Sequence, residues 1–440
     1  MTPAPASISS ARPNPDRSRR RFWCSFFLIL IALVVGFYQV ELWWGRASWR
    51  TYERDAVRRG VKLDFYDFVP PQIPDAENFA SIPLMQAVFD ADDSGQAIPK
   101  PFALVKDSSA RPKLSDLWNQ RHPDLDAWQK ILIEQGYLPQ TGNTPAADIL
   151  RALGSFAGPL QELRDADMRR HCRFPVHWEK GPAASLPHLG VLQTAAQLYS
   201  LRLSAHLANG ESPAAYEDFR DGLRLATAIR EEPSIISGLV RISIHALMLN
   251  CVWDGLAQQQ WRPSELEKIE ADIAKIDWLA DYVFALSSER GAVNGIFGTV
   301  IHDPKMLAKT FGQPSTASEY LRPYPAGWVY QSKVRTNRFV DELLARVEPV
   351  RRRHFSERPL PSSARNLPTW SAGTRYLLFV LLSSPLETVE AKYLQCASIS
   401  DEARIACALE RFRMTNGSYP SDLAELSPAF IAELPVEVVS

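Results

Sequence analysis

Residues 187–230 read PHLGVLQTAAQLYSLRLSAHLANGESPAAYEDFRDGLRLATAIR, and this stretch decides the fold class. Apolar residues recur at helical spacing on both sides of Asn209-Gly210, a pair that stops the first segment. Ser212 as a cap and Pro213 in the first turn are typical of a second helix, which runs to about Arg230. The stretch therefore predicts two antiparallel helices joined by a short turn.

The same pattern continues beyond this pair. Ser234 can cap a third, very apolar helix that extends to Gln260, and Pro263 opens a fourth. Helices that follow one another through short turns pack as antiparallel neighbours, so the predicted fold class is mainly α, with an antiparallel helical array. The pair at 189–230 is similar to one tetratricopeptide-type unit, although its period is not repeated at a fixed spacing elsewhere.

The N-terminal apolar run is close to the length that crosses a membrane. From Phe22 to Tyr38 it contains one clearly polar residue, Ser25, and tryptophans stand near both ends. We therefore predict a transmembrane anchor that contacts the lipid bilayer through residues 22–40. A cleaved signal peptide is the alternative, but the run ends in YQVELWW at 38–44, where a cleavage site would need small residues.

The charges around this run predict its orientation. Five arginines precede it and are opposed by a single acidic residue, Asp16, whereas the residues directly after it carry a mixed charge. This bias predicts a cytoplasmic N-terminus and a C-terminal domain outside the cytoplasm, with a single pass through the membrane. The arginines also resemble a twin-arginine export signal, but the missing cleavage site favours a simple basic flank.

Proline positions and composition divide the rest of the chain. Trp49 to Arg59 is expected to form a separate short helix that Gly60 ends, and the stretch 280–301 a helix interrupted by glycines. The apolar segment 376–382 should start a buried helix. The predicted organisation is a disordered cytoplasmic tail at 1–17, the anchor at 18–45, an extended proline-rich connection at 46–115, a helical domain at 116–350, a linker at 351–370 and a C-terminal helical segment at 371–440.

Composition and motifs exclude several function classes. The net charge of −1 provides no basic field for nucleic acid. The chain lacks G-x-S-x-G, H-E-x-x-H, G-x-G-x-x-G and a phosphate-binding G-x-x-x-x-G-K loop, which lowers the odds of an enzyme. No catalytic, cofactor or metal site is predicted, and the sequence does not identify a small-molecule ligand.

The cysteines leave two interpretations open. Cys24 lies in the anchor, and the other four could form two disulfides in an oxidising compartment or remain buried thiols. Their spacing shows no disulfide framework, which favours thiols. The four are Cys172, Cys251, Cys396 and Cys407.

Two groups of residues are candidates for chemistry. His171, Cys172, His177 and His188 form a local cluster of metal-capable side chains, but their spacing matches no established zinc pattern, so a structural role is favoured. Glu289, followed by Arg290, could act as a general acid or base if burial raised its pKa. It could equally pair with an arginine and hold two helices together, which is the favoured interpretation.

Two resemblances follow from longer stretches. Residues 403–435, which begin with ARIACALERFRMTNGSYP and continue through Leu423, Leu426 and Leu434-Pro435, resemble the segment behind the first helix of type II secretion pseudopilins. There a helix ends at Asn-Gly before a Tyr-Pro turn. The whole layout, with PPQIPDAENFA at 70–80, FPVHWE at 174–179, the helix pair and the Tyr-Pro tail, resembles uncharacterised envelope proteins of Planctomycetes and Verrucomicrobia. The second resemblance implies a location, the inner membrane of a bacterial cell, and a fold, but no activity.

These observations predict a membrane-anchored, non-catalytic scaffold whose helical array binds another envelope protein or peptidoglycan-associated material. The alternative is an envelope hydrolase whose active site forms only in the fold. A deep pocket that holds Glu289, His177 or His188 would favour the hydrolase. A shallow groove with exposed aromatic residues would favour the scaffold.

Overall fold

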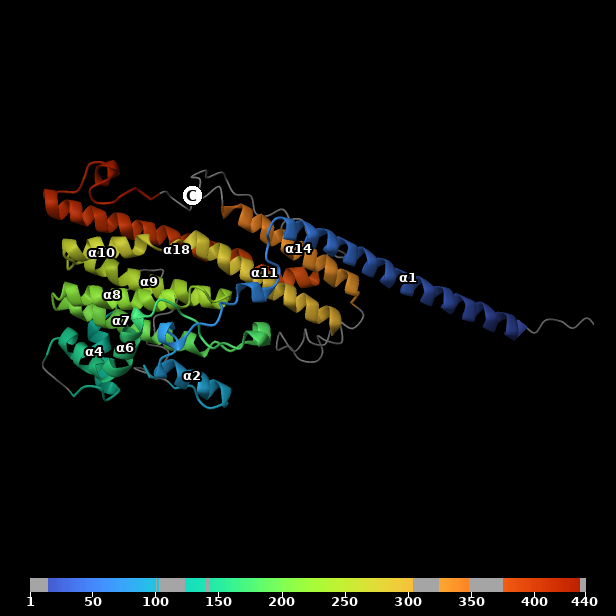
Figure 1. The fold of residues 1–440 in the computed structure, drawn as a ribbon, viewed down its shortest axis with the longest axis horizontal. Helices are drawn as coiled ribbons and strands as arrows, with labels where there is room; N and C mark the ends of the chain where they lie inside the picture. The colour runs from blue at the N-terminus through green and yellow to red at the C-terminus, as the bar shows by residue number, and fades with distance from the viewer. Residues whose placement is uncertain are drawn as a thin grey trace, which may run out of the picture. The chain divides into compact units, whose positions relative to one another are not determined.

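The computed structural model describes residues 15–99, 101–102, 123–139, 143–303, 324–347 and 375–435. Within these ranges the regular structure is α-helix and short 3-10 turns without a β-strand, so the predicted mainly helical class is confirmed (Figure 1). The chain forms two compact units. Unit 1 holds the described residues of 15–61, 297–335 and 367–379, and unit 2 holds those of 62–296, 336–366 and 380–435.

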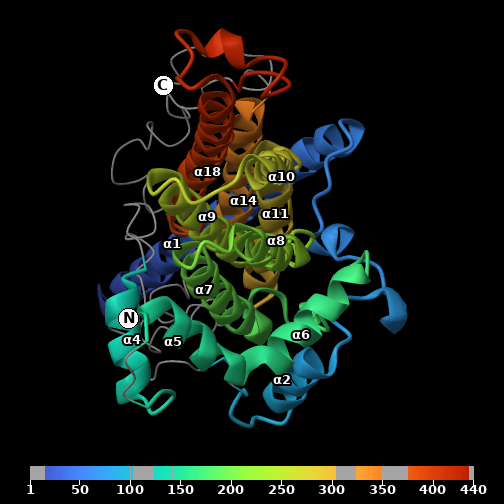
Figure 2. The same ribbon diagram turned by 90° about the vertical axis from the view of Figure 1, so that its left-hand side faces the viewer.

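The predicted helix pair lies at the centre of unit 2. It consists of α7 (Pro187–Ala208) and α8 (Ser212–Ala228), which pack against each other and against α9 (Ile235–Ala257). Figure 2 shows α5 and α6 on one side of α7, with α8 and α9 on the other. Because α7 is covered from both sides, its apolar side chains are buried around most of the helix.

The predicted caps are confirmed at one helix and wrong at another. Ser234 caps α9, since its hydroxyl accepts the Ile236 N–H at 3.2 Å. Ser212 does not cap α8, because it is already the first helical residue. Its Oγ donates to Glu265 Oε2 at 3.2 Å and accepts the Arg262 N–H at 3.3 Å. The hydroxyl thus joins α8 to the start of α10 (Pro263–Ala274).

Shorter elements precede α7 and form one edge of unit 2. Helices α2 and α5 each start at a proline, and Thr144 caps α5 by accepting the Ala147 N–H. The elements are η1 (Phe65–Phe68), η2 (Asp75–Glu77), α2 (Pro83–Asp93), α4 (Leu125–Glu134), α5 (Pro145–Leu153), η4 (Gly154–Phe156), α6 (Ala157–Asp165), η5 (Ala166–Met168) and η6 (Trp178–Ala183). They place α5 and α6 against α7, where the candidate site is found.

Three long helices follow α10: α11 (Trp278–His302), α14 (Ala326–Ala345) and α18 (Leu377–Asn416). The predicted interruption of α11 by glycines is wrong, because the helix is continuous. Gly291 instead permits a close approach: a Cβ there would lie 2.6 Å from the backbone N of Phe65. The buried helix expected to start at 376–382 is confirmed, and it extends to Asn416.

The C-terminal segment folds back on the end of α18. Gly417 has a φ of +80° and stops the helix, as the Asn-Gly pattern predicted. The short turn η7 (Leu423–Leu426) then brings Leu426 and Ile431 against Ala408 of α18. Tyr419 donates a hydrogen bond to Glu410 Oε2 at 3.0 Å, which holds the Tyr-Pro turn on the helix.

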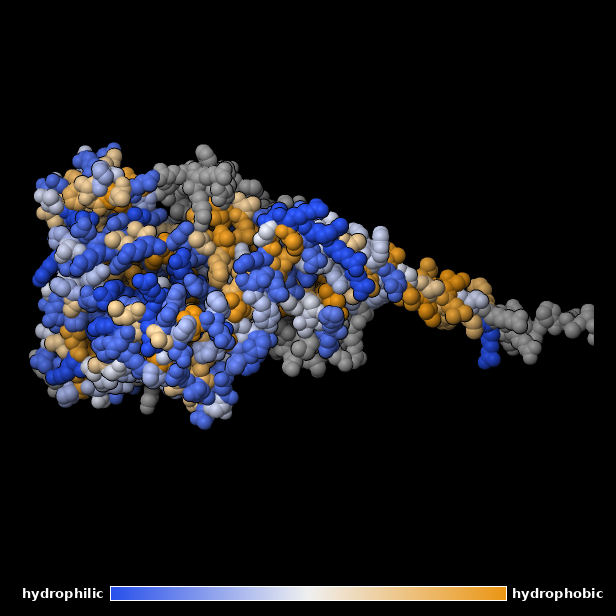
Figure 3. Space-filling model, in the orientation of Figure 1, coloured by the Kyte–Doolittle hydropathy of each residue, from blue (hydrophilic) through white to orange (hydrophobic). Residues whose placement is uncertain are grey.

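Helix α1 (Pro15–Arg58) is one continuous helix, so the separate helix expected at 49–59 is wrong. Its two halves differ. The large apolar side chains from Phe22 to Phe37 are all exposed, as the apolar colour along α1 in Figure 3 shows. The second half buries a stripe at helical spacing against other residues of unit 1: Glu41, Gly45, Trp49, Tyr52 and Ala56.

Among the described residues, two helices are long and apolar enough to cross a membrane. In α1, the most apolar window of Phe22–Arg58 has a mean hydropathy of 2.2 and none of it is buried. The corresponding window of α9 reaches 1.7, but 72% of it is buried inside the protein, as expected of a core helix. The N-terminal apolar helix is therefore the candidate span.

Several predicted features lie outside the described residues. They are the tail at 1–14, part of the connection and of the next segment at 103–122, and the linker at 351–370. Residues 15–17, which were included in the disordered tail, begin α1.

Candidate functional site

The four metal-capable side chains of the 171–188 region do not converge. The His171 side chain is exposed and its backbone is fixed, since its carbonyl accepts the Phe79 N–H at 2.8 Å. His177 lies at the surface, with its ring nitrogens 2.9 Å from Asp93 Oδ1 and 2.8 Å from Glu179 Oε1. Within the described residues, no three His, Cys, Asp or Glu side chains are grouped so as to hold a metal ion.

The surroundings of His188 are those of a core residue. The ring is fully buried, stacks on Phe174 at 4.0 Å between centroids, and lies 2.7 Å from Glu232 Oε1 through Nε2. Ser237 donates to the other oxygen of Glu232 at 2.6 Å. Burial raises the pKa of the nearby Cys172 thiol far above its ordinary value, so this thiol is not a ready nucleophile. All five cysteines are unpaired in the structure.

The sequence favoured a pair between Glu289 and an arginine that holds two helices together, but the structure gives the joining role to Arg290. Arg290 forms the helix-joining ion pair, at 3.0 Å to Asp341 of α14. Glu289 takes no part in it. Burial raises the pKa of the Glu289 carboxyl to about 7, which is suitable for general acid–base chemistry.

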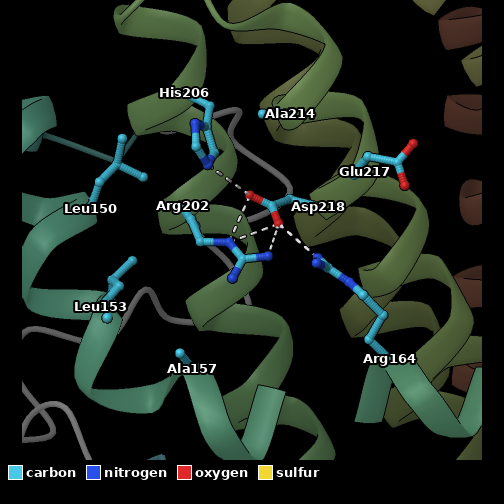
Figure 4. A pocket seen from close by; sticks show the side chains of 10 residues that line it. Leu150, Leu153, Ala157, Arg164, Arg202, His206, Ala214, Glu217 and Asp218 are labelled. Atoms are coloured by element: carbon cyan, nitrogen blue, oxygen red, sulfur yellow. Dashed lines mark hydrogen bonds and ion pairs between the residues drawn. The ribbon is translucent and has the colours of Figure 1, made fainter. Parts of the chain in front are cut away.

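A cavity of unit 2 lies between α5, α6, α7 and α8 (Figure 4). It has a volume of about 410 Å³, within the range of small-ligand pockets. One wall is mainly apolar and comes from α5 and the start of α6. The other is charged and comes from the end of α6, α7 and α8. The apolar residues are Leu150, Leu153 and Ala157, and the charged or titratable ones are Arg164, Arg202, His206, Glu217 and Asp218.

A buried carboxylate organises the charged wall. Asp218 is 1% exposed, and Arg202 Nε donates to both of its oxygens, at 2.8 and 2.9 Å. Arg164 Nη2 and His206 Nε2 each lie 3.8 Å from it. Burial raises the pKa of the Asp218 carboxyl, while the hydrogen bonds and charge of Arg202 act in the opposite direction.

This cavity was not predicted from the sequence, although a signal was present. Arg202 stands between two leucines in the apolar stretch 198–203 (LYSLRL), within a helix expected to be covered. An arginine in such a position needs a buried acidic partner, and Asp218 is one helix away. Neither Glu289, His177 nor His188 lines the cavity, so the pocket that would have favoured a hydrolase is not found there.

Comparisons of the chain with protein-family models, curated proteins and solved structures gave no match. The resemblances to planctomycete and verrucomicrobial envelope proteins and to pseudopilins therefore stay predictions.

Proposed function

We propose that the protein is held in a bacterial inner membrane by α1 and presents unit 2 outside the cytoplasm as a binding surface for another envelope protein. The exposed first half of α1 carries the proposal. Large apolar side chains are exposed continuously over this half, for example Phe22, Leu28 and Leu33 at 66–67%. Soluble proteins rarely expose such an area to water, whereas a bilayer would cover it.

The flanking charges support the orientation. Arg19 and Arg20 precede the apolar run, and positive residues are retained on the cytoplasmic side. Helix packing supports the binding role, since the array of α7, α8, α9 and α10 offers a broad helical surface of the kind that binds protein segments.

Topology is tested with the complete chain. Alkaline phosphatase, which is active only outside the cytoplasm, and a green fluorescent protein, which is fluorescent only inside when exported unfolded, are each fused after Ser440. We expect phosphatase activity and no fluorescence. A matched variant with Arg17, Arg19, Arg20 and Arg21 replaced by Gln should weaken this bias. Fluorescence without phosphatase activity from stable fusions would overturn the external location.

The binding role is tested in living cells with a photo-crosslinking amino acid. Placed at Ala214 or Glu217, beside the cavity, it should give a discrete adduct with another envelope protein. Placed at Met168, which is 89% exposed but lies outside the cavity lining, it should not. The same adducts from every position, or none from any position across unit 2, would overturn the scaffold role.

A further inference from the structure

The α5–α8 cavity has an arginine nitrogen that makes no hydrogen bond or ion pair within the described residues. Arg202 binds Asp218 through Nε and Nη2, and within the described chain no hydrogen bond or ion pair uses its Nη1. Figure 4 shows this third nitrogen on the side of the guanidinium that faces Leu153 and Ala157. The cavity thus has an N–H donor directed at its apolar wall.

The acidic residues of the same wall already have partners. Asp218 is bound by Arg202, with Arg164 and His206 close by. Glu217 lies 2.8 Å from Arg220. A ligand therefore meets a free donor beside neutralised carboxylates, which favours an acceptor, and an anion above a neutral acceptor.

The apolar wall opposite Arg202 indicates the chemistry of the other part of the ligand. Leu150 and Leu153 of α5 and Ala157 of α6 present only carbon atoms, and a volume of about 410 Å³ suits a small molecule or the end of a chain. An aliphatic group against these side chains would remove apolar surface from water on both partners.

We propose that this cavity binds a carboxylate that carries a short aliphatic chain, with the carboxylate on Arg202 and the chain against Leu150 and Leu153. Because Asp218 already binds Arg202 through Nε and Nη2, the ligand carboxylate would accept a charge-assisted hydrogen bond from Nη1. The same chemistry has two sources, a free aliphatic acid or the C-terminal residue of a peptide. The inference goes beyond the scaffold role and does not depend on the membrane topology.

Binding is measured by isothermal titration calorimetry on the full chain in lipid nanodiscs, with empty nanodiscs as the blank. The probes are hexanoate and its neutral analogue hexanamide, and the peptide Gly-Ala-Leu with a free or an amidated C-terminus. We expect at least one acid to bind at least tenfold more tightly than its amide. Equal affinities of acid and amide in both pairs, or no binding of either acid, would overturn the proposal.

Two variants test the location of the site, and neither leaves a buried charge without its partner. Arg202→Leu combined with Asp218→Leu removes the donor and its partner together, which such pairs often tolerate. Ala157→Trp fills the cavity and keeps the ion pairs. Each should weaken acid binding at least tenfold. Gln161→Trp, on the same helix but outside the cavity lining, should not.

The relative affinities of the probes then show whether the carboxylate comes from a free acid or from the C-terminus of a peptide. Binding of Gly-Ala-Leu but not of its amide, at an affinity above that of hexanoate, assigns the site to a chain end. Binding of hexanoate alone assigns it to a free acid. Unchanged affinity in both cavity variants, judged against circular dichroism that shows intact helices, would place the binding elsewhere and overturn the assignment.

Discussion

At the scale of single residues, half-buried Glu289 and buried His245 of unit 2 respond to pH in opposite directions. Burial raises the pKa of Glu289 from 4.5 to about 7, and burial next to Arg241 lowers the pKa of His245 from 6.5 to about 3. Between pH 4.5 and 7 the folded state holds a proton on Glu289 that the unfolded chain releases. Between pH 3 and 6.5 the unfolded chain binds a proton on His245 that the folded state excludes.

Glu289→Gln should stabilise the protein only at high pH. The folded carboxyl is neutral at pH 4 but must ionise in its buried position above pH 7, so its contribution to stability is lost as the pH rises from 4.5 to 7. The variant should match the wild type at pH 4 and exceed it at pH 8 by up to about 3 kcal/mol. Urea unfolding of the full chain in detergent, followed by circular dichroism, measures the difference. Equal stability at pH 8 would show that Glu289 has a normal pKa.

His245→Gln should flatten the acid side of the stability profile. His245 Nε2 lies 2.8 Å from Ser400 Oγ, and the glutamine amide can donate there without titrating. Wild-type stability should fall as the pH is lowered from 6.5 towards 3, by on the order of 5 kcal/mol from this group. The same urea series should show a smaller fall in the variant. The control His177→Gln, at an exposed histidine, should keep the wild-type slope; a parallel fall in all three proteins would assign the acid sensitivity to other groups.

The sequence could indicate Glu289 and Arg202 as unusual, but it could not assign their partners. The periodic pattern of apolar residues shows that a charged residue within such a stretch is expected to be buried. The partner depends on which helices meet, and Arg164 and Asp218 lie far apart in the chain. For the same reason Ser212, a good cap by its position, binds Glu265 of another helix instead.

At the scale of elements, α11 shows that glycines within a helix can serve packing and need not end it. Gly291 and Gly295 lie one turn apart, yet only Gly291 faces another backbone, with Phe65 N 2.6 Å and Phe65 Cα 2.7 Å from the place of a Cβ. The place of a Cβ at Gly295 has no such neighbour within 4 Å. The helix was predicted from the sequence, but both glycines were interpreted as interruptions. The local sequence does not show that a distant segment approaches the helix at Gly291.

Gly291→Ala and Gly295→Ala should therefore change stability in opposite directions. The methyl group at 291 must displace the 65 backbone, which cannot move aside as a side chain can, at a cost of about 1–3 kcal/mol. At 295 alanine replaces glycine in an exposed helix position and should stabilise by up to about 1 kcal/mol. Thermal unfolding of the two single variants beside the wild type gives the comparison. A stabilising Gly291→Ala would contradict the close packing of Phe65 on α11.

At the scale of the whole molecule, α1 has two roles along one continuous helix. Its first half has exposed apolar side chains, and its second half belongs to unit 1. There Glu41 binds Gln331 Nε2 at 2.9 Å and Arg375 Nη2 at 2.5 Å, and Lys333 lies 3.9 Å from the ring centroid of Trp49. Apolar composition predicted the first role. The buried stripe of the second half depends on α14, which the sequence placed in a separate segment.

Two truncations should separate these roles. Removing residues 1–36 takes away the exposed apolar half but keeps Glu41 and Trp49, so the protein should leave the membrane and remain folded. Removing residues 1–60 also deletes the partners of Gln331, Lys333 and Arg375, and leaves a buried face of α14 uncovered. That protein should be cleaved by protease between 324 and 347 at least tenfold faster than the shorter truncation, since opening becomes easier. Fractionation after a carbonate wash, followed by limited proteolysis, measures both effects. If the first truncation stayed with the membrane, a different element would hold the protein there; if both were cleaved at the same rate, the second half of α1 would not support unit 1.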